Sequence, residues 1–331
     1  MLEHGGNLHD VIHRFGRPRE VWMDLSTGIN PHWYVSAPLA QNCWHRLPEI
    51  CDTLTQAAQH YYGAARLLPV AGTQAAIQAL PRLRAASKVV VAAPSYAEHL
   101  HHWRLQGHAV RQVAYEALAA AVDDCDVMVI CNPNNPTGEK IAPEKLVAWA
   151  KNLAARGGWL VVDEAFGDMT PATSLARSAD APGLIVLHSV GKFFGLAGLR
   201  LGFVAAAPEL LSQLSEALGP WTVSTAAQQI GSAALSDTDW QQATRLQLAN
   251  SAARMRTMLA HYSITSQGTD LFQWWPEIEP ECFWQHMATR GILVRLFTNA
   301  ARGIRLGLPA DEAGWQRLET ALEQWNESNR K

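Results

Sequence analysis

The sequence predicts an α/β protein with a large domain, in which helices cover a mostly parallel sheet, and a smaller α+β domain. Three observations predict this. Short β-branched runs alternate with helix-sized segments up to about residue 207, which is typical of parallel strands joined by helices. After residue 208, long helical patterns and short strand pieces replace that alternation. The chain has 331 residues, 48% of them hydrophobic, which is enough for one large core and a smaller one.

The join between the two domains is expected near Leu218-Gly219-Pro220, where glycine and proline interrupt the helical pattern. We therefore expect a large domain over residues 25–218. The small domain is expected to combine residues 219–331 with the N-terminal segment, residues 1–24.

Composition narrows the class of protein. The formal net charge is −3 and the sequence has no cluster of basic residues, so neither a nucleic acid nor a membrane surface is an expected partner. No apolar run approaches transmembrane length, and no apolar h-region follows Met1, so we expect neither a membrane span nor a signal peptide. The five cysteines are scattered without CxxC spacing, which favours a reducing cytoplasm over disulfides or zinc.

The N-terminal third carries local signals. Residues 8–15 are expected to form a short helix, and residues 24–31 contain Gly28 and an Asn-Pro pair, which predict a turn-rich segment. Residues 49–62 repeat apolar side chains at helical spacing, and Gly63 is expected to end that helix. Residues 67–70 are extended and turn at Gly72 into a helix that runs to about residue 83.

Apolar, β-branched runs predict the remaining strands, and proline and glycine mark several of their ends. The expected strands of the large domain are 88–93, 107–113, 126–131, 159–166, 184–188 and 202–206, with helices at 99–106 and 143–156. In the small domain the expected helices are 208–218, 238–262, 279–290 and 310–327, and the strand pieces are 264–275, 292–295 and 302–307.

Polar side chains follow the ends of successive strands. The carboxyl ends of parallel strands share one edge of a sheet, where α/β proteins bind their ligands. The helix that opens at Gly72 presents backbone N–H groups suited to an anion, although a plain helix cap explains the same residues. The residues expected at this edge are Gly72, Thr73, Gln74, Tyr96, Asn135, Asp163, Ser189, Lys192 and Arg200.

Lys192 stands in a glycine-rich loop between two apolar strands. A desolvated lysine amine has a lowered pKa and forms Schiff bases, whereas an ordinary loop lysine extends into solvent. Asp163 ends another apolar strand, where an unpaired carboxylate is costly. The chain thus combines a lysine, a buried acid and anion-binding groups in one expected site.

These groups meet the needs of pyridoxal 5'-phosphate, an electron sink that depends on a protonated ring nitrogen. Lys192 can supply the imine, and Asp163 can hold the proton on the ring nitrogen. Asn135 can donate to the phenolic oxygen, and Tyr96 can stack on the ring. Thr73, Ser189 and Arg200 can hold the phosphate, together with the helix N-terminus.

A metal site is the alternative for the histidines of residues 99–102. Only His99 and His102 share a helical face, and no cysteine or carboxylate joins them at ligand spacing in the sequence. We therefore expect a solvated helix face and no metal.

The chain also resembles a known group of enzymes. The run Asn132 to Gly138, the sequence Asp163-Glu164-Ala165-Phe166, and Ser189-x-x-Lys192 with Arg200 resemble fold-type I pyridoxal-phosphate enzymes of the aspartate aminotransferase superfamily, near the histidinol-phosphate aminotransferase branch. His4-Gly5-Gly6-Asn7 and residues 24–31 look like the threonine-phosphate decarboxylase group of cobalamin biosynthesis.

This resemblance implies a homodimer that decarboxylates L-threonine O-3-phosphate to (R)-1-amino-2-propanol O-2-phosphate. An aminotransferase acting on a phosphorylated amino compound is the alternative, and a catalytically silent binding module of the same fold is a third possibility. By resemblance, Lys192 and Asp163 are the catalytic residues, and the other residues of the sheet edge bind the cofactor. The residues implied to contact the substrate are His4, Gly5, Gly28, Asn135, Arg295 and Arg305.

The chain departs from the family pattern at three positions. Phe166 stands where aminotransferases of this branch usually have a tyrosine, which fits the decarboxylase group. Leu47 stands where related enzymes have a tyrosine that reaches the partner subunit's cofactor phosphate. Gly28 stands where the decarboxylase group often has an asparagine in contact with substrate, and here the chain resembles relatives in the aerobic pathway.

Overall fold

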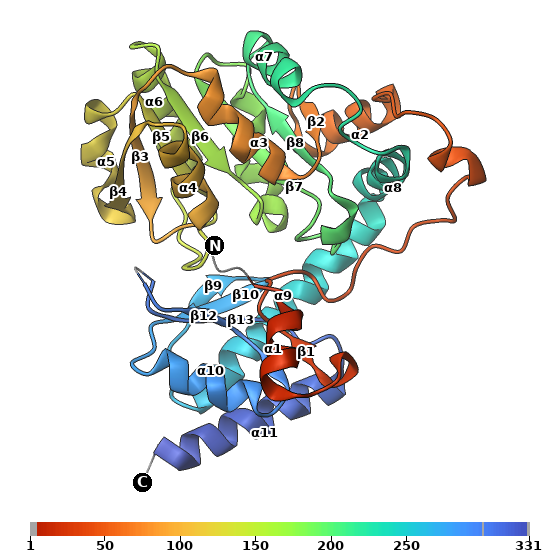
Figure 1. Cartoon of the computed structure of the whole chain (residues 1–331), viewed down its shortest axis with the longest axis vertical. Coiled ribbons are helices and arrows are strands. Elements are labelled where there is room, and N and C mark those ends of the chain that lie inside the picture. The colour runs from red at the N-terminus through yellow and green to blue at the C-terminus, as the bar shows by residue number, and fades with distance from the viewer. Residues whose placement is uncertain (1–4, 300, 330–331) are drawn as a thin grey trace. The chain divides into compact units, whose positions relative to one another are not determined.

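The computed structural model describes residues 5–299 and 301–329. The chain divides into two compact units, coloured along the sequence in Figure 1. The large unit comprises Trp33–Asn135 and Glu139–Gln242, and the small unit comprises Met1–His32, Pro136–Gly138 and Ala243–Lys331. This division falls inside a helix at residue 242, whereas the sequence places a boundary near Gly219; the predicted boundaries therefore stay a proposal.

The large unit is built on a seven-stranded sheet with the order β2-β8-β7-β6-β5-β3-β4. The strands β3 to β7 pair in parallel, while β8 is antiparallel to both β7 and β2. The expected α/β architecture with a mostly parallel sheet is confirmed. The strands are β2 (Leu68–Val70), β3 (Lys88–Ala93), β4 (Ala109–Ala114), β5 (Val127–Cys131), β6 (Trp159–Asp163), β7 (Leu184–Ser189) and β8 (Gly202–Ala205).

Helices cover this sheet because its central strands are apolar throughout their length. Ile185 and Leu187 of β7 are completely buried and pack in one cluster with Ile77 and Leu214 of two helices. The helices of the large unit are α2 (Asp52–Tyr62), α3 (Thr73–Ala79), α4 (Ala97–Leu105), α5 (Leu118–Ala121), α6 (Pro143–Ala154), α7 (Pro208–Leu218) and α8 (Thr225–Ser236).

The sequence did not predict α8, which is rich in alanine, serine and glutamine. Ser224 caps its N-terminus, because the Ser224 side chain accepts a hydrogen bond from the Ala227 N–H at 3.1 Å. Gly231 lets the helix pack closely, since a Cβ there would lie 2.3 Å from a methyl carbon of Leu201. A helix of small residues shows little contrast between an apolar and a polar face, so its periodicity gives no signal.

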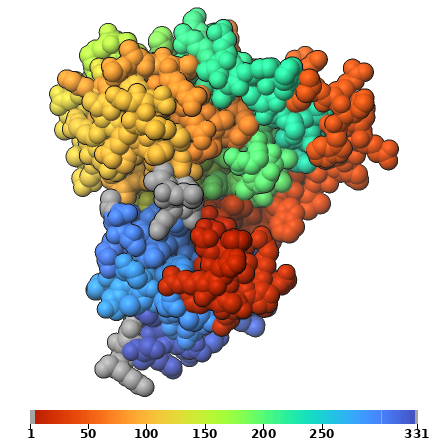
Figure 2. All heavy atoms as spheres, viewed as in Figure 1, coloured from red at the N-terminus to blue at the C-terminus, as the bar shows by residue number. Residues whose placement is uncertain are grey.

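The small unit joins both ends of the chain. Its four-stranded antiparallel sheet has the order β12-β13-β10-β9, and β1 pairs in parallel with β11. In Figure 2 the red N-terminal residues lie against blue C-terminal ones, where Val11 and Trp22 pack with Leu293. The elements are α1 (Leu8–Phe15), β1 (Met23–Asp24), α9 (Thr238–His261), β9 (Gln267–Thr269), β10 (Phe272–Trp275), α10 (Pro280–Ala288), β11 (Ile292–Leu293), β12 (Arg295–Phe297), β13 (Gly303–Gly307) and α11 (Glu312–Asn329).

Residues 292–295, expected to form one strand, belong to two sheets. Ile292 and Leu293 pair with β1, and Arg295 begins a strand that pairs with β13. Over the described residues, no helix combines the length and the apolarity that a membrane span requires.

Candidate active site

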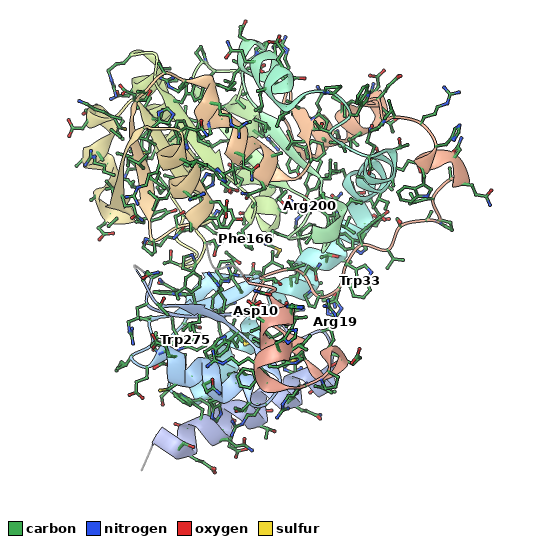
Figure 3. The ribbon with its side chains drawn as sticks, viewed as in Figure 1. Asp10, Arg19, Trp33, Phe166, Arg200 and Trp275 are labelled. Atoms are coloured by element: carbon green, nitrogen blue, oxygen red, sulfur yellow. The ribbon has the colours of Figure 1, made fainter. Side chains whose placement is uncertain are left out.

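The predicted site residues of the large unit lie around one edge of its sheet. Strands β3, β5, β6 and β7 run in parallel, so the segments that follow them emerge on the same side. Strand β2 also runs parallel to β7, because each is antiparallel to β8. The turn at Gly72 therefore leaves at this edge, and Arg200 lies just before β8, which starts there. Figure 3 labels Arg200 and Phe166 in this part of the large unit.

Gly72 and Arg200 form the first part of the site. Gly72 has a φ of +73°, and a Cβ there would lie 2.5 Å from Nη2 of Arg200. Arg200 has a left-handed φ of 55° and donates a hydrogen bond from Nη1 to the Ala197 carbonyl at 3.0 Å. The guanidinium is therefore held over a turn that has no side chain. Such a turn, next to the first N–H groups of a helix, suits a phosphate.

Asp163 is buried at the end of β6, with 5% of its surface exposed. Its Oδ2 lies 3.0 Å from Nε2 of His99, and its Oδ1 accepts a hydrogen bond from the Ala165 N–H at 3.0 Å. Burial would lower the pKa of His99, but its hydrogen bonds with Asp163 and Cys131 outweigh burial and raise that pKa to about 10. His99 is thus a cation that forms a buried ion pair with Asp163.

The expectation of a solvated face is wrong for His99, which is only 2% exposed. The ligand atoms of His99, Cys131 and Asp163 lie within 4.8 Å of one another, although no sequence spacing joins these residues. The direct hydrogen bond between His99 and Asp163 accounts for this group without an ion. The sequence did contain one indication of a buried role for His99. Residue 99 comes soon after the end of β3, and so lies near the sheet edge where the predicted site residues gather.

Lys192 is half-buried, and its Nζ lies 5.3 Å from the centroid of the Phe166 ring. Phe166 is buried, and the neighbours Val190 and Phe193 are completely buried. The backbone of the loop closes on itself through a hydrogen bond from the Gly195 N–H to the Lys192 carbonyl at 3.2 Å. The lysine therefore extends from an anchored loop over an apolar ring, unlike an ordinary surface lysine.

Gln74 and Tyr96 are linked by side-chain hydrogen bonds. The Tyr96 hydroxyl donates to Oε1 of Gln74 at 3.3 Å, and Nε2 of Gln74 donates to Oε2 of Glu98 at 2.6 Å. Burial raises the pKa of Tyr96 above its ordinary value, so the phenol stays protonated. The Gln74 amide thus fixes the Tyr96 side chain. Direct contact of Gln74 or Tyr96 with a cofactor stays a prediction. Asn135 follows β5 at the same edge, and its role also stays a prediction.

In the small unit, Arg295 lies directly opposite Arg305 across β12 and β13. Burial and, to a smaller extent, the neighbouring charge of Arg295 lower the pKa of Arg305 to about 9, although Asp24 acts in the opposite direction. Like charges facing each other across a ladder destabilise it. A bound anion would relieve this repulsion.

Ser26 contacts both Arg305 and Gly5. Nη2 of Arg305 donates to the Ser26 carbonyl at 2.5 Å, and a Cβ on Gly5 would lie 2.4 Å from that oxygen. The Gly6 N–H donates to Oγ of Ser26 at 2.7 Å. Gly28 has a φ of +62° in the turn that follows. Sequence reasoning did not single out Ser26, and His4 lies outside the described residues.

The His99–Asp163 pair predicts a specific pH dependence of stability. The folded pKa of His99, about 10, exceeds the ordinary value of about 6.5. The stabilisation is therefore complete below pH 6.5 and is lost as the pH rises through 10. Urea unfolding of the cofactor-free protein at pH 6, 8 and 10 tests this, with His99→Gln as the comparison. The interpretation fails if the stability difference between wild type and variant is the same at all three pH values.

Comparison with known proteins identifies the family. The model of the family "Aminotransferase class I and II" matches residues 30–314. A threonine-phosphate decarboxylase of Pseudomonas aeruginosa is 48% identical over 326 residues, which cover 97% of each chain. A threonine-phosphate decarboxylase of Sinorhizobium is 40% identical over 330 residues, again covering 97% of each.

A solved structure has the same fold at low sequence identity. Histidinol-phosphate aminotransferase from Sinorhizobium meliloti, in complex with pyridoxal-5'-phosphate, aligns with a TM-score of 0.80 and 23% identity over 97% of this chain and 94% of that one. The family match spans most of both compact units and includes the whole edge from Gly72 to Arg200. The chain belongs to the class I and II aminotransferase family.

Proposed function

We propose that this chain is a pyridoxal-phosphate-dependent decarboxylase that converts L-threonine O-3-phosphate to (R)-1-amino-2-propanol O-2-phosphate and carbon dioxide, as a step of cobalamin biosynthesis. The observation that carries the proposal is the identity of 48% with a threonine-phosphate decarboxylase over 97% of both chains. At the sheet edge, the arrangement of Lys192, Asp163 and Arg200 supports it.

The residues at this edge fit the cofactor. The Arg200 guanidinium packs on the turn at Gly72, which has no side chain, and so places a cation beside the first N–H groups of α3, where a phosphate group would bind. Asp163 is buried and paired with His99 at 3.0 Å, and a carboxylate held in place in this way suits a protonated ring nitrogen. Lys192 extends an amine over an apolar ring. Ser189 and Thr73 would join Arg200 at the phosphate, and Tyr96 and Asn135 would contact the ring.

Pyridoxal phosphate, when bound, supplies an electron sink for the electron pair of a bond that breaks at the substrate's Cα. Lys192 would hold the cofactor. When the ammonium group of the substrate displaces it, two protons pass from that group to the released Lys192, which then stands free as an ammonium. As carbon dioxide leaves, Cα needs a proton, and the Lys192 ammonium would deliver it. His99 and Asp163 would keep the ring nitrogen protonated throughout.

Two arginines of the small unit support the proposal that the substrate is anionic. Arg295 and Arg305 are paired across two strands, and a phosphate plus a carboxylate suits two guanidinium groups. In this proposal His4, Gly5 and Gly28 complete the substrate contacts. Phe166 offers no hydroxyl to the phenolic oxygen, which favours decarboxylation over the alternative, amino transfer by a histidinol-phosphate aminotransferase-like enzyme.

The reaction product decides between these two activities. The purified protein with pyridoxal phosphate and O-phosphothreonine should release carbon dioxide, and Lys192→Ala should abolish the release and alter the visible absorption of the bound cofactor. The control is Lys88→Ala, an exposed lysine at the start of β3. Amino transfer to a keto acid without carbon dioxide would contradict the decarboxylase, and a visible spectrum unchanged by Lys192→Ala would contradict the cofactor site.

Removing a substrate arginine should weaken substrate binding. Arg305→Gln should raise KM for O-phosphothreonine about 10- to 100-fold, because a hydrogen bond to a charged group contributes about 1.5–3 kcal/mol. The visible spectrum of the bound cofactor should not change. Arg302→Gln is the matched control, since Arg302 is half-exposed and pairs with Glu281 at 3.1 Å. An unchanged KM for Arg305→Gln would remove Arg305 from the substrate site.

We also propose that the chain is a cytoplasmic homodimer. All five cysteines are free, which suits a reducing compartment. Large apolar side chains are exposed along residues 33–50, including Trp33, Trp44 and Leu47 at 62, 70 and 65% exposure. Figure 2 draws this segment in orange at the surface of the large unit. Such a concentration of exposed apolar groups is typical of a protein interface, and a second copy would cover it.

Light scattering tests the dimer. The wild type should have about twice the chain mass of 36.3 kDa, and Trp44→Glu combined with Leu47→Glu should shift it toward the monomer. Leu246→Glu is the control, because Leu246 is equally exposed, at 66%, but lies on α9. A wild type at the monomer mass would contradict the proposal.

A further inference from the structure

Glu164 is a buried acid for which the proposed reaction has no use. It directly follows Asp163, the last residue of β6, and its carboxylate contacts Ser174 and Leu175, whereas that of Asp163 contacts His99. Only 3% of Glu164 is exposed. A buried carboxyl group is costly unless its hydrogen bonds are satisfied, so its contacts indicate its role.

The Glu164 carboxylate accepts two hydrogen bonds from the other end of an irregular segment. Oγ of Ser174 donates to its Oε2 at 2.6 Å, and the Leu175 N–H donates to its Oε1 at 2.9 Å. The Glu164 N–H itself donates to the Leu187 carbonyl of β7 at 2.9 Å. One residue thus connects the sheet to both ends of the segment that we call the 164–175 loop.

The 164–175 loop contains short 3₁₀ turns in place of a regular helix or strand: Gly167–Met169, Pro171–Thr173 and the start of Leu175–Ser178. Each turn has its own local hydrogen bonds, such as the one from the Thr170 N–H to the Gly167 carbonyl at 3.0 Å. These bonds do not join the loop to the sheet, so the position of the loop depends on its anchors. Ser174 also caps the last turn, because its Oγ accepts a hydrogen bond from the Ala176 N–H at 3.1 Å. The anchor and the cap therefore share one hydroxyl group.

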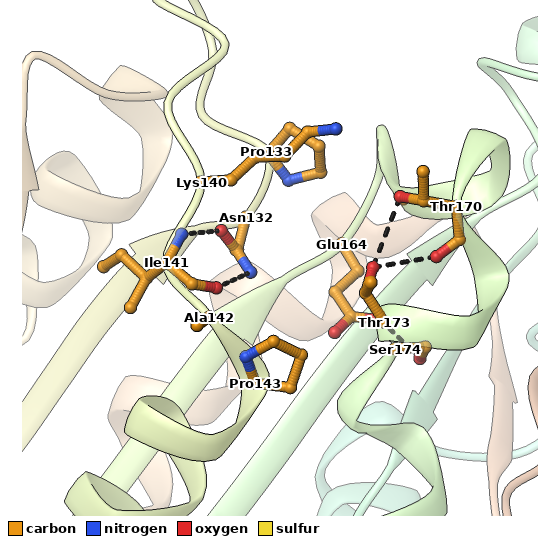
Figure 4. A pocket seen from close by; sticks show the side chains of 11 residues that line it. Asn132, Pro133, Lys140, Ile141, Ala142, Pro143, Glu164, Thr170, Thr173 and Ser174 are labelled. Carbon is orange, nitrogen blue, oxygen red and sulfur yellow. Dashed lines mark hydrogen bonds between the residues drawn. The ribbon is translucent and has the colours of Figure 1, made fainter.

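Phe166 lies in this loop, two residues after Glu164, and its ring is the one beneath Lys192. The loop also borders a pocket of about 180 Å³, which Glu164 lines together with Lys140, Thr170, Thr173 and Ser174 (Figure 4). Because this pocket lies beside the loop, side-chain packing alone does not hold the loop on that side. Without the two hydrogen bonds, the loop has room to move.

We propose that Glu164 is a positioning residue: its hydrogen bonds to Ser174 and Leu175 fix the 164–175 loop, and the loop holds the Phe166 ring beside the Lys192 amine. The anchoring of the loop stands on the contacts alone. Its effect on Lys192 as the residue that binds the cofactor rests on the proposed function.

The pKa of Glu164 lies near neutral pH, so its protonation can be changed under conditions in which the protein is studied. Burial is the main cause that raises the pKa of Glu164, to about 7, and the charge of Asp168 adds to it, although the hydrogen bonds from Leu175 and Ser174 act in the opposite direction. The folded pKa exceeds the ordinary value, so protonated Glu164 stabilises the fold fully below about pH 4.3, and this contribution is lost as the pH rises through 7. The titratable or charged groups around it are Asp163, Asp168, His188, which burial keeps neutral, Tyr62 and Lys140.

The variants separate the anchor from the charge. Glu164→Gln keeps both contacts, because its amide oxygen can accept from Leu175 and its amide group can donate to Ser174. Glu164→Ala removes both contacts and keeps the Ser174 cap, whereas Ser174→Ala removes one contact together with the cap on the Ala176 N–H. The control is Glu216→Ala, an exposed glutamate near the end of α7 in the same unit.

The first measurement is amide hydrogen exchange of residues 166–176 in the cofactor-free protein at pH 8. We expect exchange about 10-fold faster in Glu164→Ala and Ser174→Ala, since local opening follows the loss of local contacts. Glu164→Gln and Glu216→Ala should match the wild type. If Glu164→Ala exchanges like Glu216→Ala, the proposal is overturned; if Glu164→Ala does not fold, Ser174→Ala decides in the same way.

The second measurement is the pH titration of the visible absorption with pyridoxal phosphate bound. Glu164→Ala should shift the midpoint by about half a pH unit or more, because a displaced Phe166 changes the surroundings of Lys192. An unchanged midpoint with faster exchange would overturn the link to Lys192. If pyridoxal phosphate produces no absorption band in the wild type, the proposed function fails, and the exchange result still decides the anchoring role of Glu164.

Discussion

The site of the large unit depends on a carboxylate buried at the end of a strand. An uncompensated buried charge costs several kcal/mol, so Asp163 requires a cation, and His99 of α4 provides it at 3.0 Å. Cys131 of β5 lies opposite Asp163 in the sheet register and completes the group. Because α4 follows β3, this contact joins the ends of β3, β5 and β6. The edge that carries the predicted cofactor residues is therefore held together by its own charged pair.

Much of this edge could be predicted from the sequence, because Gly72, Asp163 and Lys192 each follow an apolar strand run and the parallel topology brings such ends together. His99 could not be placed this way. Whether a helical side chain faces the sheet depends on how the helix is rotated, and two neighbouring histidines made the segment look solvated. Helix α8 was missed because the stripe that it buries consists mainly of small residues, such as Ala227, Gly231 and Ala234, which differ little from the alanines and serines on its other face.

The register of the strands in the small unit also could not be predicted from the sequence. Arg295 and Arg305 were expected on strands, but their direct opposition follows from where the chain leaves one sheet and enters another, between Leu293 and Arg295. Local propensity says nothing about that switch, since both pieces are short and apolar. The contact between Gly5 and Ser26 depends in turn on Arg305, whose guanidinium binds the Ser26 carbonyl. Long-range contacts of this kind are set by tertiary packing.

The left-handed turn at Arg200 has an evolutionary consequence. Its guanidinium occupies the space that a side chain at position 72 would need, so these two positions, more than a hundred residues apart in sequence, are coupled. Position 72 also has a constraint of its own, because its φ of +73° favours glycine whatever stands at residue 200. Replacing Arg200 would therefore free the space above position 72 without making that position permissive, and glycine should persist there in a background where residue 200 has changed.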